Sequence, residues 1–195
     1  MTHESPQVLV TGASGFLGGH VVTELTSAGY RVLANGRDAG RLAGLGVDTL
    51  AAPLAALPTA PLQGVDAIVH CAALSSPWGR WADFREANVD GTAAVIEAAR
   101  RNGVRRIVFV SSPSVYSQAA DRLDISEDDV DPGNRLNHYI ASKLRAEELV
   151  RAAVADGSVP EAVILRPRGL IGAGDPRLAP RLLDVHRRIG VPLFR

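Results

Sequence analysis

The feature that most constrains the fold is an apolar segment that runs directly into glycines at positions 12, 15 and 18. The apolar segment, Val8–Thr11, predicts a strand, and the amphipathic residues after the glycines predict a helix. Gly12 permits a tight turn that a Cβ atom would obstruct. Gly15 lets the backbone approach a pyrophosphate, and Gly18 lets the helix pack on the strand. The helix N-terminus would direct free N–H groups at phosphates, so the segment predicts a dinucleotide site; the alternative is a glycine turn without a ligand.

Composition limits the class of protein without naming a function. The chain has 195 residues, enough for one domain, and its 21 basic and 21 acidic residues cancel, so nothing favours nucleic acid as a partner. The single cysteine, Cys71, excludes an internal disulfide framework and is typical of a reducing compartment. The N-terminal Met1–Pro6 lacks a signal-peptide pattern, and no apolar run approaches the ~18 residues of a membrane span. These features predict a cytoplasmic protein that does not bind a membrane.

Strands and helices alternate along the chain. The predicted strands are Gln7–Thr11, Tyr30–Asn35, Asp48–Ala51, Asp66–Cys71, Arg106–Ser111 and Ala162–Arg166. The predicted helices are Phe16–Ala28, Ala39–Leu45, Trp81–Asn102, Asn137–Ala155 and Pro180–Ile189, with a proline-punctuated loop at Ala55–Gly64. Short, apolar, β-branched strands are typical of buried parallel sheets. The sequence therefore predicts an α/β fold, a doubly wound parallel sheet of the Rossmann type.

Several motifs, in a fixed order, carry a family resemblance. They are Thr11–Gly18, His70–Ala73, Asn88–Thr92, Val110–Tyr116, Tyr139–Lys143 and Arg166–Gly172. Together they resemble the extended short-chain dehydrogenase/reductases, which include the NAD-dependent epimerase/dehydratases and the 3-beta-hydroxysteroid dehydrogenases. The stretch Ala72–Trp81 is most similar to the 3-beta-hydroxysteroid-dehydrogenase-like branch. The resemblance implies an NAD(P)-dependent enzyme whose catalytic residues are Ser112, Tyr139, Lys143 and Asn88.

Tyr139 and Lys143 are four residues apart on a predicted helix, so their side chains share one face. A free phenol titrates at about 10, too high for an efficient proton shuttle at neutral pH, and a nearby ammonium group lowers that value. The pair therefore fits acid–base catalysis. Taken alone, the same spacing is also compatible with an ordinary tyrosine and a surface lysine on an amphipathic helix.

A serine cluster follows a predicted buried strand, at the carboxyl end where open α/β sheets bind ligands. A hydroxyl there is suited to donating a hydrogen bond to a substrate oxygen. Ser111 and Ser114 compete with Ser112 for this role, and a turn or helix cap is the alternative for each of them. The family's Ser-x-x-x-Tyr spacing, counted back from Tyr116, selects Ser112.

Asn88 lies inside a predicted helix, although asparagine is a mediocre helix former. It is therefore either a solvated surface residue or retained for a polar role. The resemblance implies that Asn88 holds a water molecule or a backbone group that positions Lys143.

The choice between NADP and NAD depends on the end of the second strand, where NAD enzymes usually place an acid for the ribose 2′-hydroxyl. That position is Gly36, followed by Arg37. Glycine leaves room and arginine can clamp a phosphate, so NADP is favoured over NAD. Asp38 is the alternative, because a shift of one residue would bring an acid to the ribose. The resemblance implies a cofactor site formed by Gly12, Ser14, Gly15, Phe16, Leu17, Gly18, Arg37, Leu54, Cys71, Ala72, Ala73, Tyr139, Lys143 and Pro167.

Two further segments bear on the cofactor and on metals. The family often has Gly-Asp-Leu after the third strand, where this chain has Ala52-Pro53-Leu54. The resemblance implies that Leu54 packs on the adenine ring without the polar adenine contact of the family. His70 and Cys71 end a predicted strand, and no other histidine, cysteine or carboxylate stands at metal-ligand spacing. His70 is therefore predicted to be a wall residue, and no metal site is expected.

The resemblance implies hydride transfer between NADP(H) and a carbonyl or secondary alcohol. A nucleotide-sugar epimerase would use the same residues, and a non-catalytic NADP(H)-binding protein is a third hypothesis. Pro113 and Ser114 stand where dehydratases of the family place an acid pair, which disfavours dehydration.

Residues 1–175 are predicted to form the NAD(P)-binding domain, and residues 176–195 to begin a truncated substrate-binding region. The resemblance implies a homodimer formed through the two long alanine-rich helices, Trp81–Asn102 and Asn137–Ala155; the alternative is that both helices pack only on the sheet.

Overall fold

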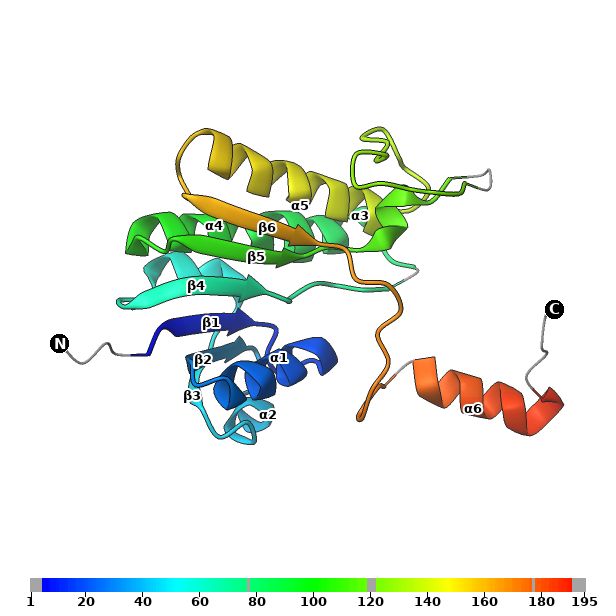
Figure 1. The fold of residues 1–195 in the computed structure, drawn as a ribbon, viewed down its shortest axis with the longest axis horizontal. Helices are drawn as coiled ribbons and strands as arrows, with labels where there is room; N and C mark the ends of the chain where they lie inside the picture. The colour runs from blue at the N-terminus through cyan, green and yellow to red at the C-terminus, as the bar shows by residue number, and fades with distance from the viewer. Residues whose placement is uncertain (1–4, 77, 119–121, 177, 191–195) are drawn as a thin grey trace.

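In the described part of the chain, six strands pair in parallel, in the order β3-β2-β1-β4-β5-β6. The computed structural model describes residues 5–76, 78–118, 122–176 and 178–190. The chain builds from β1 outward to β3, crosses to β4 and continues outward to β6 (Figure 1). The strands are β1 (Gln7–Thr11), β2 (Arg31–Gly36), β3 (Asp48–Ala51), β4 (Val65–His70), β5 (Arg106–Val110) and β6 (Glu161–Leu165). This arrangement confirms the predicted doubly wound α/β fold.

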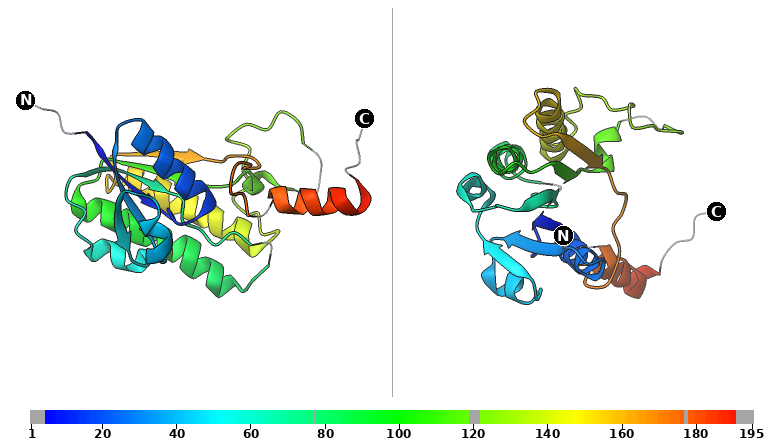
Figure 2. Two further views of the ribbon diagram at one scale, coloured as in Figure 1. Left: turned by 90° about the horizontal axis from the view of Figure 1, so that it is seen from below. Right: turned by 60° about the vertical axis from the view of Figure 1, so that its left-hand side comes forward.

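Helices cover both faces of the sheet, α1 and α2 on one face and α4 and α5 on the other (Figure 2). The α-helices are α1 (Phe16–Ser27), α2 (Ala39–Ala43), α3 (Trp81–Phe84), α4 (Gly91–Asn102), α5 (His138–Ala155) and α6 (Leu178–Ile189). Three other helical segments are η1 (Leu54–Thr59), η2 (Arg85–Asp90) and η3 (Pro113–Tyr116). The predicted bounds of the confirmed helices and strands differ from these by one or two residues at several ends.

Side chains of β1 enter two separate cores because successive residues of a strand point to opposite faces. Leu9 packs in the cluster under α4 and α5, and Val8 and Val10 pack in the cluster under α1 and α2. All three are at least 96% buried, with exposed fractions of 0, 4 and 0%. The central strand is therefore covered on both sides, as its uninterrupted apolar run predicts.

One sequence prediction is confirmed with an added detail, and another needs correction. The helix predicted over Trp81–Asn102 runs without a break through α3, the π-helical η2 and α4. Isolated π turns concentrate at functional sites, and this one contains the buried Asn88. The loop predicted over Ala55–Gly64 begins as the 3₁₀ helix η1, whose Leu57 is fully buried.

The segment after β6 crosses the sheet edge toward α1 (Figure 1). The carbonyl oxygen of Ala173 lies 2.9 Å from Nε2 of His20, and Gly172 lies beside Phe16. Helix α6 then projects beyond the sheet, with Leu182 exposed (Figures 1 and 2). Residues 1–4, within the predicted nucleotide-binding domain, and residues 191–195, within the predicted second region, lie outside the described residues.

Candidate functional site

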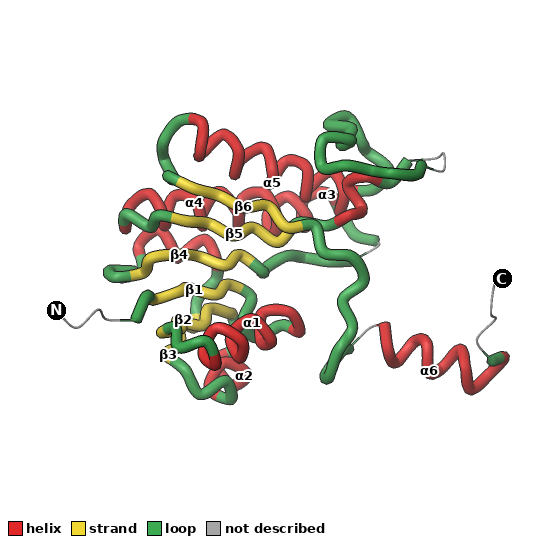
Figure 3. The backbone as a smooth tube through the Cα atoms, in the orientation of Figure 1, coloured by secondary structure: helices red, strands yellow, loops and turns green. Residues whose placement is uncertain are grey.

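The predicted site residues converge on one edge of the sheet, because parallel strands all end on the same side (Figure 3). Gly12 follows β1, Arg37 follows β2, Cys71 follows β4, Ser112 lies just beyond β5 and Pro167 just beyond β6. Strands β1 and β4 are neighbours although the chain leaves them in opposite directions along the sheet. Ligands of open α/β sheets bind at such a switch point.

The glycine segment forms a cradle at this switch point. Gly12 has a φ of +69°, and a Cβ atom there would lie 2.7 Å from both the nitrogen and the Cα of Ala72. A Cβ on Gly18 would overlap the carbonyl oxygen of Gly12. Gly15 is the N-cap of α1 and supplies no side-chain acceptor to the first turn, which also lacks an acidic residue. The first-turn N–H groups are thus free of side-chain caps, and the cradle fits a dinucleotide pyrophosphate.

The end of β2 presents an arginine at the same edge. Arg37 is exposed, and within the described part of the chain it has no hydrogen bond or ion pair. The Asp38 carboxylate is engaged elsewhere: it accepts a hydrogen bond from the backbone N–H of Arg41 at 3.1 Å and pairs with that guanidinium at 3.5 Å. Gly36 is buried, and a Cβ there would lie 2.8 Å from Oγ of Ser14. The missing side chain of Gly36 thus makes room for Ser14.

His70 lies in a buried chain of hydrogen bonds instead of at a wall. The Ala72 N–H donates to Oγ1 of Thr11 at 3.4 Å, and Thr11 Oγ1 lies 2.7 Å from Nδ1 of His70. On the other side, Nε2 of His70 lies 3.1 Å from Oγ1 of Thr92, which donates to the carbonyl oxygen of Asn88 at 2.6 Å. Because the Thr92 hydrogen is used, Nε2 of His70 donates and Nδ1 accepts. The chain of contacts joins the backbone beside the glycine cradle to η2.

Burial, together with the charge of Lys143, lowers the pKa of His70 to about 3. Between pH 6.5 and 3 the unfolded chain therefore binds a proton that the folded chain excludes, so the free energy of unfolding falls as the pH falls. We expect a loss of about 1.4 kcal/mol per pH unit from this one group. His70→Gln should flatten the dependence of urea-unfolding free energy on pH. The exposed His186, replaced in the same way, should leave it unchanged; equal slopes in native and His70→Gln proteins would contradict the assignment.

Asn88 connects two segments of the site. Its Oδ1 accepts from the Leu74 N–H at 2.7 Å, and its Nδ2 donates to the Leu74 carbonyl oxygen at 3.1 Å. The same Nδ2 lies 2.9 Å from Oγ of Ser142, the residue before Lys143 on α5. Asn88 is 2% exposed, which excludes the solvated-surface alternative. It fixes the backbone that follows Ala72 and Ala73 and reaches Lys143 only through the neighbouring serine.

Lys143 is buried at the carboxyl end of β5. Its Nζ donates to the carbonyl oxygen of Val110 at 2.7 Å and lies 4.2 Å from the ring centroid of Phe109. Burial lowers the pKa of Lys143 to about 8, although the charge of Glu147 acts in the opposite direction. Lys143 is only 2% exposed, and this burial excludes the alternative that it is an ordinary surface lysine.

Tyr139 and the serines lie on segments that pack together. Ile140 of α5 packs against Val115 of η3, and Tyr139 precedes Ile140. Ser112 is the N-cap of η3, and its Oγ donates to Oγ of Ser114 at 3.0 Å. The Tyr139 ring contacts Phe84, with ring centroids 6.4 Å apart.

Ser112 is 8% exposed, and Lys143 contacts the carbonyl two residues before it. The structure thus brings Ser112, Lys143 and the first turn of α5 to the end of β5. The hydroxyl of Ser111 is buried, and it helps to lower the pKa of the Glu147 carboxyl.

The remaining predicted cofactor residues have varied surroundings. Leu54 packs against α4, where a Cβ on Gly91 would lie 2.8 Å from its Cδ1. Burial raises the pKa of the Cys71 thiol to about 12, against the opposing effect of Lys143, so the thiol stays protonated. Phe16 meets His20 edge-on, with centroids 5.1 Å apart. Leu17 lies beside Phe16 in the first turn of α1 and is partly buried.

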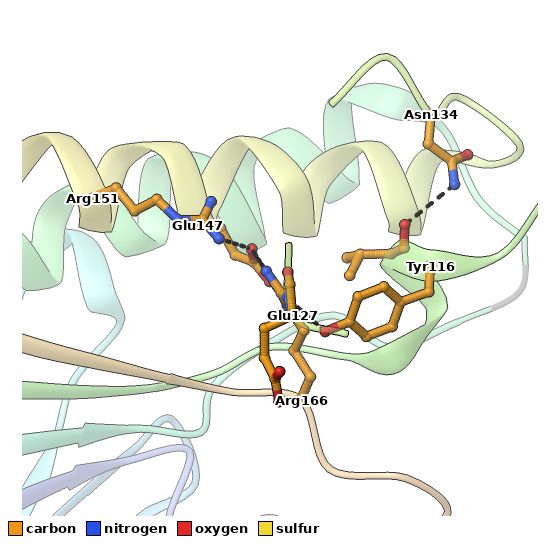
Figure 4. A network of polar contacts seen from close by, with 7 residues as sticks. Tyr116, Glu127, Asn134, Glu147, Arg151 and Arg166 are labelled. Carbon is orange, nitrogen blue, oxygen red and sulfur yellow. Dashed lines mark hydrogen bonds and ion pairs between the residues drawn. The ribbon is translucent and has the colours of Figure 1, made fainter. Parts of the chain in front are cut away.

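The sequence interpretation missed a buried ionic network behind the site. Glu147, on α5, accepts from Nε and a terminal nitrogen of Arg166 at 2.9 and 2.7 Å, and from Arg151 at 2.8 Å. Arg166 also donates to the hydroxyl of Tyr116 at 2.5 Å and to the carbonyl oxygen of Glu127 at 3.0 Å (Figure 4). The four-residue spacing from Lys143 to Glu147 is visible in the sequence, but the pairing of Glu147 with Arg166, just after β6, is not.

One edge of this doubly wound sheet carries a glycine cradle, a buried lysine and a tyrosine. This arrangement is typical of proteins that bind a nicotinamide dinucleotide. The model of the NAD dependent epimerase/dehydratase family matches residues 8–190. A 2-alkyl-3-oxoalkanoate reductase of Stenotrophomonas maltophilia (strain K279a) is 39% identical over 188 residues, covering 93% of this chain and 56% of that protein. A decarboxylating sterol-4-alpha-carboxylate 3-dehydrogenase of Mus musculus is 32% identical, covering 92% of this chain and 50% of that protein.

Among solved structures, MoeE5 in complex with UDP-glucose and NAD matches with a TM-score of 0.80 and 34% identity, covering 92% of this chain and 60% of that one. The chain therefore belongs to the NAD-dependent epimerase/dehydratase family, which confirms the resemblance drawn from its motifs. Its named relatives support the 3-beta-hydroxysteroid-dehydrogenase-like branch of the extended short-chain dehydrogenase/reductases. The chain spans about half the length of these curated relatives.

Proposed function

We propose that the protein transfers hydride between NADP(H) and a carbonyl or secondary alcohol, with Tyr139 as the acid–base residue. The observation that carries this proposal is the buried Lys143 ammonium group, fixed on the Val110 carbonyl between the segment of Ser112 and the helix of Tyr139. A buried lysine costs free energy, so its retention at the ligand edge of the sheet favours a chemical role over a structural one.

The chain's own residues divide the reaction between them. A bound nicotinamide nucleotide supplies the hydride. Tyr139 delivers the proton to the carbonyl oxygen during reduction, and Ser112 donates a hydrogen bond to the same oxygen. The Ser112 hydrogen, which points to Ser114 in the ligand-free protein, turns to the substrate by rotation about one bond. Lys143 uses one of its donors on Val110 and has two left for ribose hydroxyls.

The cofactor residues support NADP over NAD. Arg37 is unpaired within the described residues and stands at the end of β2, whereas Asp38 is committed to capping α2. Asn88 and the backbone of Ala72 and Ala73 would support the nicotinamide ribose, and Leu54 and Pro167 would complete the walls of the cofactor site. Residues 1–175 form the nucleotide-binding domain in this proposal, and residues 176–195 begin the substrate-binding region.

Steady consumption of NADPH in the presence of a carbonyl compound tests the proposal, and 2-alkyl-3-oxoalkanoates are the first compounds to assay because the 39% identical relative is named for them. The absence of carbonyl-dependent NADPH consumption, together with tight NADPH binding, would instead support the non-catalytic binding protein. The presence of Ser112, Tyr139 and Lys143 in the sequence supports turnover, because a protein without turnover has no chemical need for all three.

A nucleotide-sugar epimerase is the second candidate, favoured by the likeness to MoeE5 in complex with UDP-glucose and NAD. The two activities differ in their net consumption of nucleotide. Epimerisation of UDP-glucose would leave the total NADPH unchanged and alter the sugar, whereas ketone reduction consumes NADPH in proportion to product. Chromatography of UDP-glucose incubated with the protein therefore separates them.

We further propose a homodimer formed through α4 and α5, which lie together on one face of the sheet. Ala93 on α4 and Ala152 on α5 are exposed, and small exposed side chains permit close approach of helices. Light scattering at micromolar concentration should give twice the 20.6 kDa chain mass. Ala152→Arg should yield the monomer, while Ala43→Arg on the exposed side of α2 should not. A native protein that scatters as a monomer would rule this dimer out.

A further inference from the structure

Behind Tyr139 and Lys143, a third polar residue continues the same face of α5. Tyr139, Lys143 and Glu147 are each four residues apart, so they lie one above another along the helix. Glu147 is fully buried, although a carboxylate is rarely fully buried unless it is paired. It is not among the predicted catalytic or cofactor-binding residues, and the proposed mechanism does not use it.

The Glu147 carboxylate is held ionised by two arginines. Arg166, whose side chain is 8% exposed, binds it with two hydrogen bonds, and Arg151 adds a third from the half-exposed side of α5 (Figure 4). Burial alone would raise the pKa of Glu147, but hydrogen bonds from Arg166 and Ser111, together with the charges of both arginines, lower it overall. A buried ion pair adds little net stability compared with apolar packing, so stability alone is a weak reason to keep one.

Lys143 has few other charges around it. The titratable groups that act on it are Glu147 from its own helix and His70 and Cys71 from the end of β4 and the residue after it. The pKa of His70 lies at about 3 and that of Cys71 at about 12, so both are neutral at neutral pH. Among the described residues, Glu147 is thus the one charged group of opposite sign that acts on the Lys143 ammonium at neutral pH.

We propose that Glu147 is a positioning residue for Lys143: its buried carboxylate, clamped by Arg166 and Arg151, keeps Lys143 an ammonium ion on the Val110 carbonyl. This inference rests on the proposed function, in which the Lys143 cation supports Tyr139 and the nucleotide ribose. Arg166 belongs to the chain just after β6 and also binds Tyr116, so the charge support is tied to the segment that carries Ser112.

The sequence allows Lys143 to be observed directly, because it is the only lysine among the 195 residues. Protein grown with ¹³C-lysine gives one side-chain ε-CH₂ signal, whose chemical shift follows protonation. In the native protein the midpoint is expected at about 8. Glu147→Gln keeps the size and the acceptor oxygen but removes the charge, so the midpoint should fall by about one pH unit or more. Glu147→Asp, which retains the charge, should restore most of the shift.

Arg151→Met provides a test of opposite sign in a side chain that is 54% exposed, where folding is not at risk. Removing this cation leaves the Glu147 charge less compensated, so the Lys143 midpoint should rise. Glu148→Gln, an exposed neighbour on the same helix, should leave it unchanged. A Lys143 midpoint that stays at the native value in both Glu147→Gln and Arg151→Met overturns the proposal; if Glu147→Gln does not fold, the Arg151→Met result decides alone.

The pH dependence of turnover gives an independent measure of the effect of Glu147 on the protonation of Lys143. A lower Lys143 pKa means that the ammonium loses its proton at lower pH, so the alkaline limb of the NADPH-dependent reduction should move toward acid in Glu147→Gln. A purely structural role would lower kcat at every pH alike and leave the limb in place, which would also overturn the proposal. A protein without any carbonyl reduction refutes the proposed function, whereas the Lys143 titration still decides this inference.

Discussion

Replacing Tyr139 with phenylalanine is expected to lower turnover by about 10²-fold or more, the scale on which a lost general acid acts, while nucleotide binding survives. The ring remains in contact with Phe84, and the Tyr139 hydroxyl has no hydrogen bond to any described residue whose loss would disturb the fold. The change therefore removes the proton donor and little else. Initial rates of NADPH oxidation with a responsive carbonyl compound measure the effect.

The chain contains a matched control. Tyr30 is 41% exposed and precedes β2, at the opposite edge of the sheet from the site. Tyr30→Phe should leave both turnover and the affinity for NADPH unchanged. Near-normal turnover in Tyr139→Phe would remove this residue from the mechanism, and loss of NADPH binding in that variant would mean that the hydroxyl serves the cofactor and not the proton transfer.

The parts of the site that follow from backbone geometry were predictable from the sequence. Gly12 requires a positive φ and a close approach to Ala72, and no other residue type satisfies both, so its motif constrains the structure strongly. The carboxyl ends of parallel strands must meet at one edge, so the order of elements alone predicts that Arg37 and Ser112 lie at the same edge of the sheet. These predictions depend on local chemistry and on topology alone.

Other parts depend on contacts between distant segments. Asn88 lies four residues from the buried Phe84 and from the buried Thr92, so its burial follows helical periodicity. Its partners Leu74 and Ser142 lie 14 and 54 residues away, and the sequence pattern does not identify them. The packing role of Gly36 also does not follow from the sequence. A side chain at this position would meet Ser14, which lies in another loop.

The same distinction explains why Glu147 escaped the sequence interpretation. A glutamate four residues after a lysine is an ordinary pattern on a solvated helix, where the pair contributes little. Only the position of Arg166, at the end of a strand that pairs beside β5, converts the pattern into a buried ionic network. The charge environment of Lys143 is thus a property of the sheet order.

NADPH is expected to bind more tightly than NADH by about ten- to a hundredfold, because Arg37 would meet the 2′-phosphate in a charge-assisted contact of roughly 1.5–3 kcal/mol. Arg37→Leu should remove most of this difference, because it should lower the affinity for NADPH and leave the affinity for NADH unchanged. Added salt should narrow the gap in the native protein, since exposed charges are screened. Fluorescence titration of both nucleotides against both proteins measures the four dissociation constants.

The position of Ser14 decides how this preference is best tested. Exchanging Gly36 for aspartate would add an acceptor for the ribose hydroxyl, but its Cβ would lie 2.8 Å from Oγ of Ser14, so the exchange would also shift a residue of the phosphate cradle. Arg37→Leu avoids this, and Arg105→Leu, an exposed arginine just before β5 at the opposite edge, controls for net charge. If the native protein binds the two nucleotides with equal affinity, and Arg37→Leu leaves both affinities unchanged, then Arg37 does not contact the 2′-phosphate. If the native protein prefers NADH, an acidic residue and not Arg37 contacts the ribose 2′-hydroxyl. Asp38 would then have to give up its hydrogen bond to the backbone N–H of Arg41 at the start of α2.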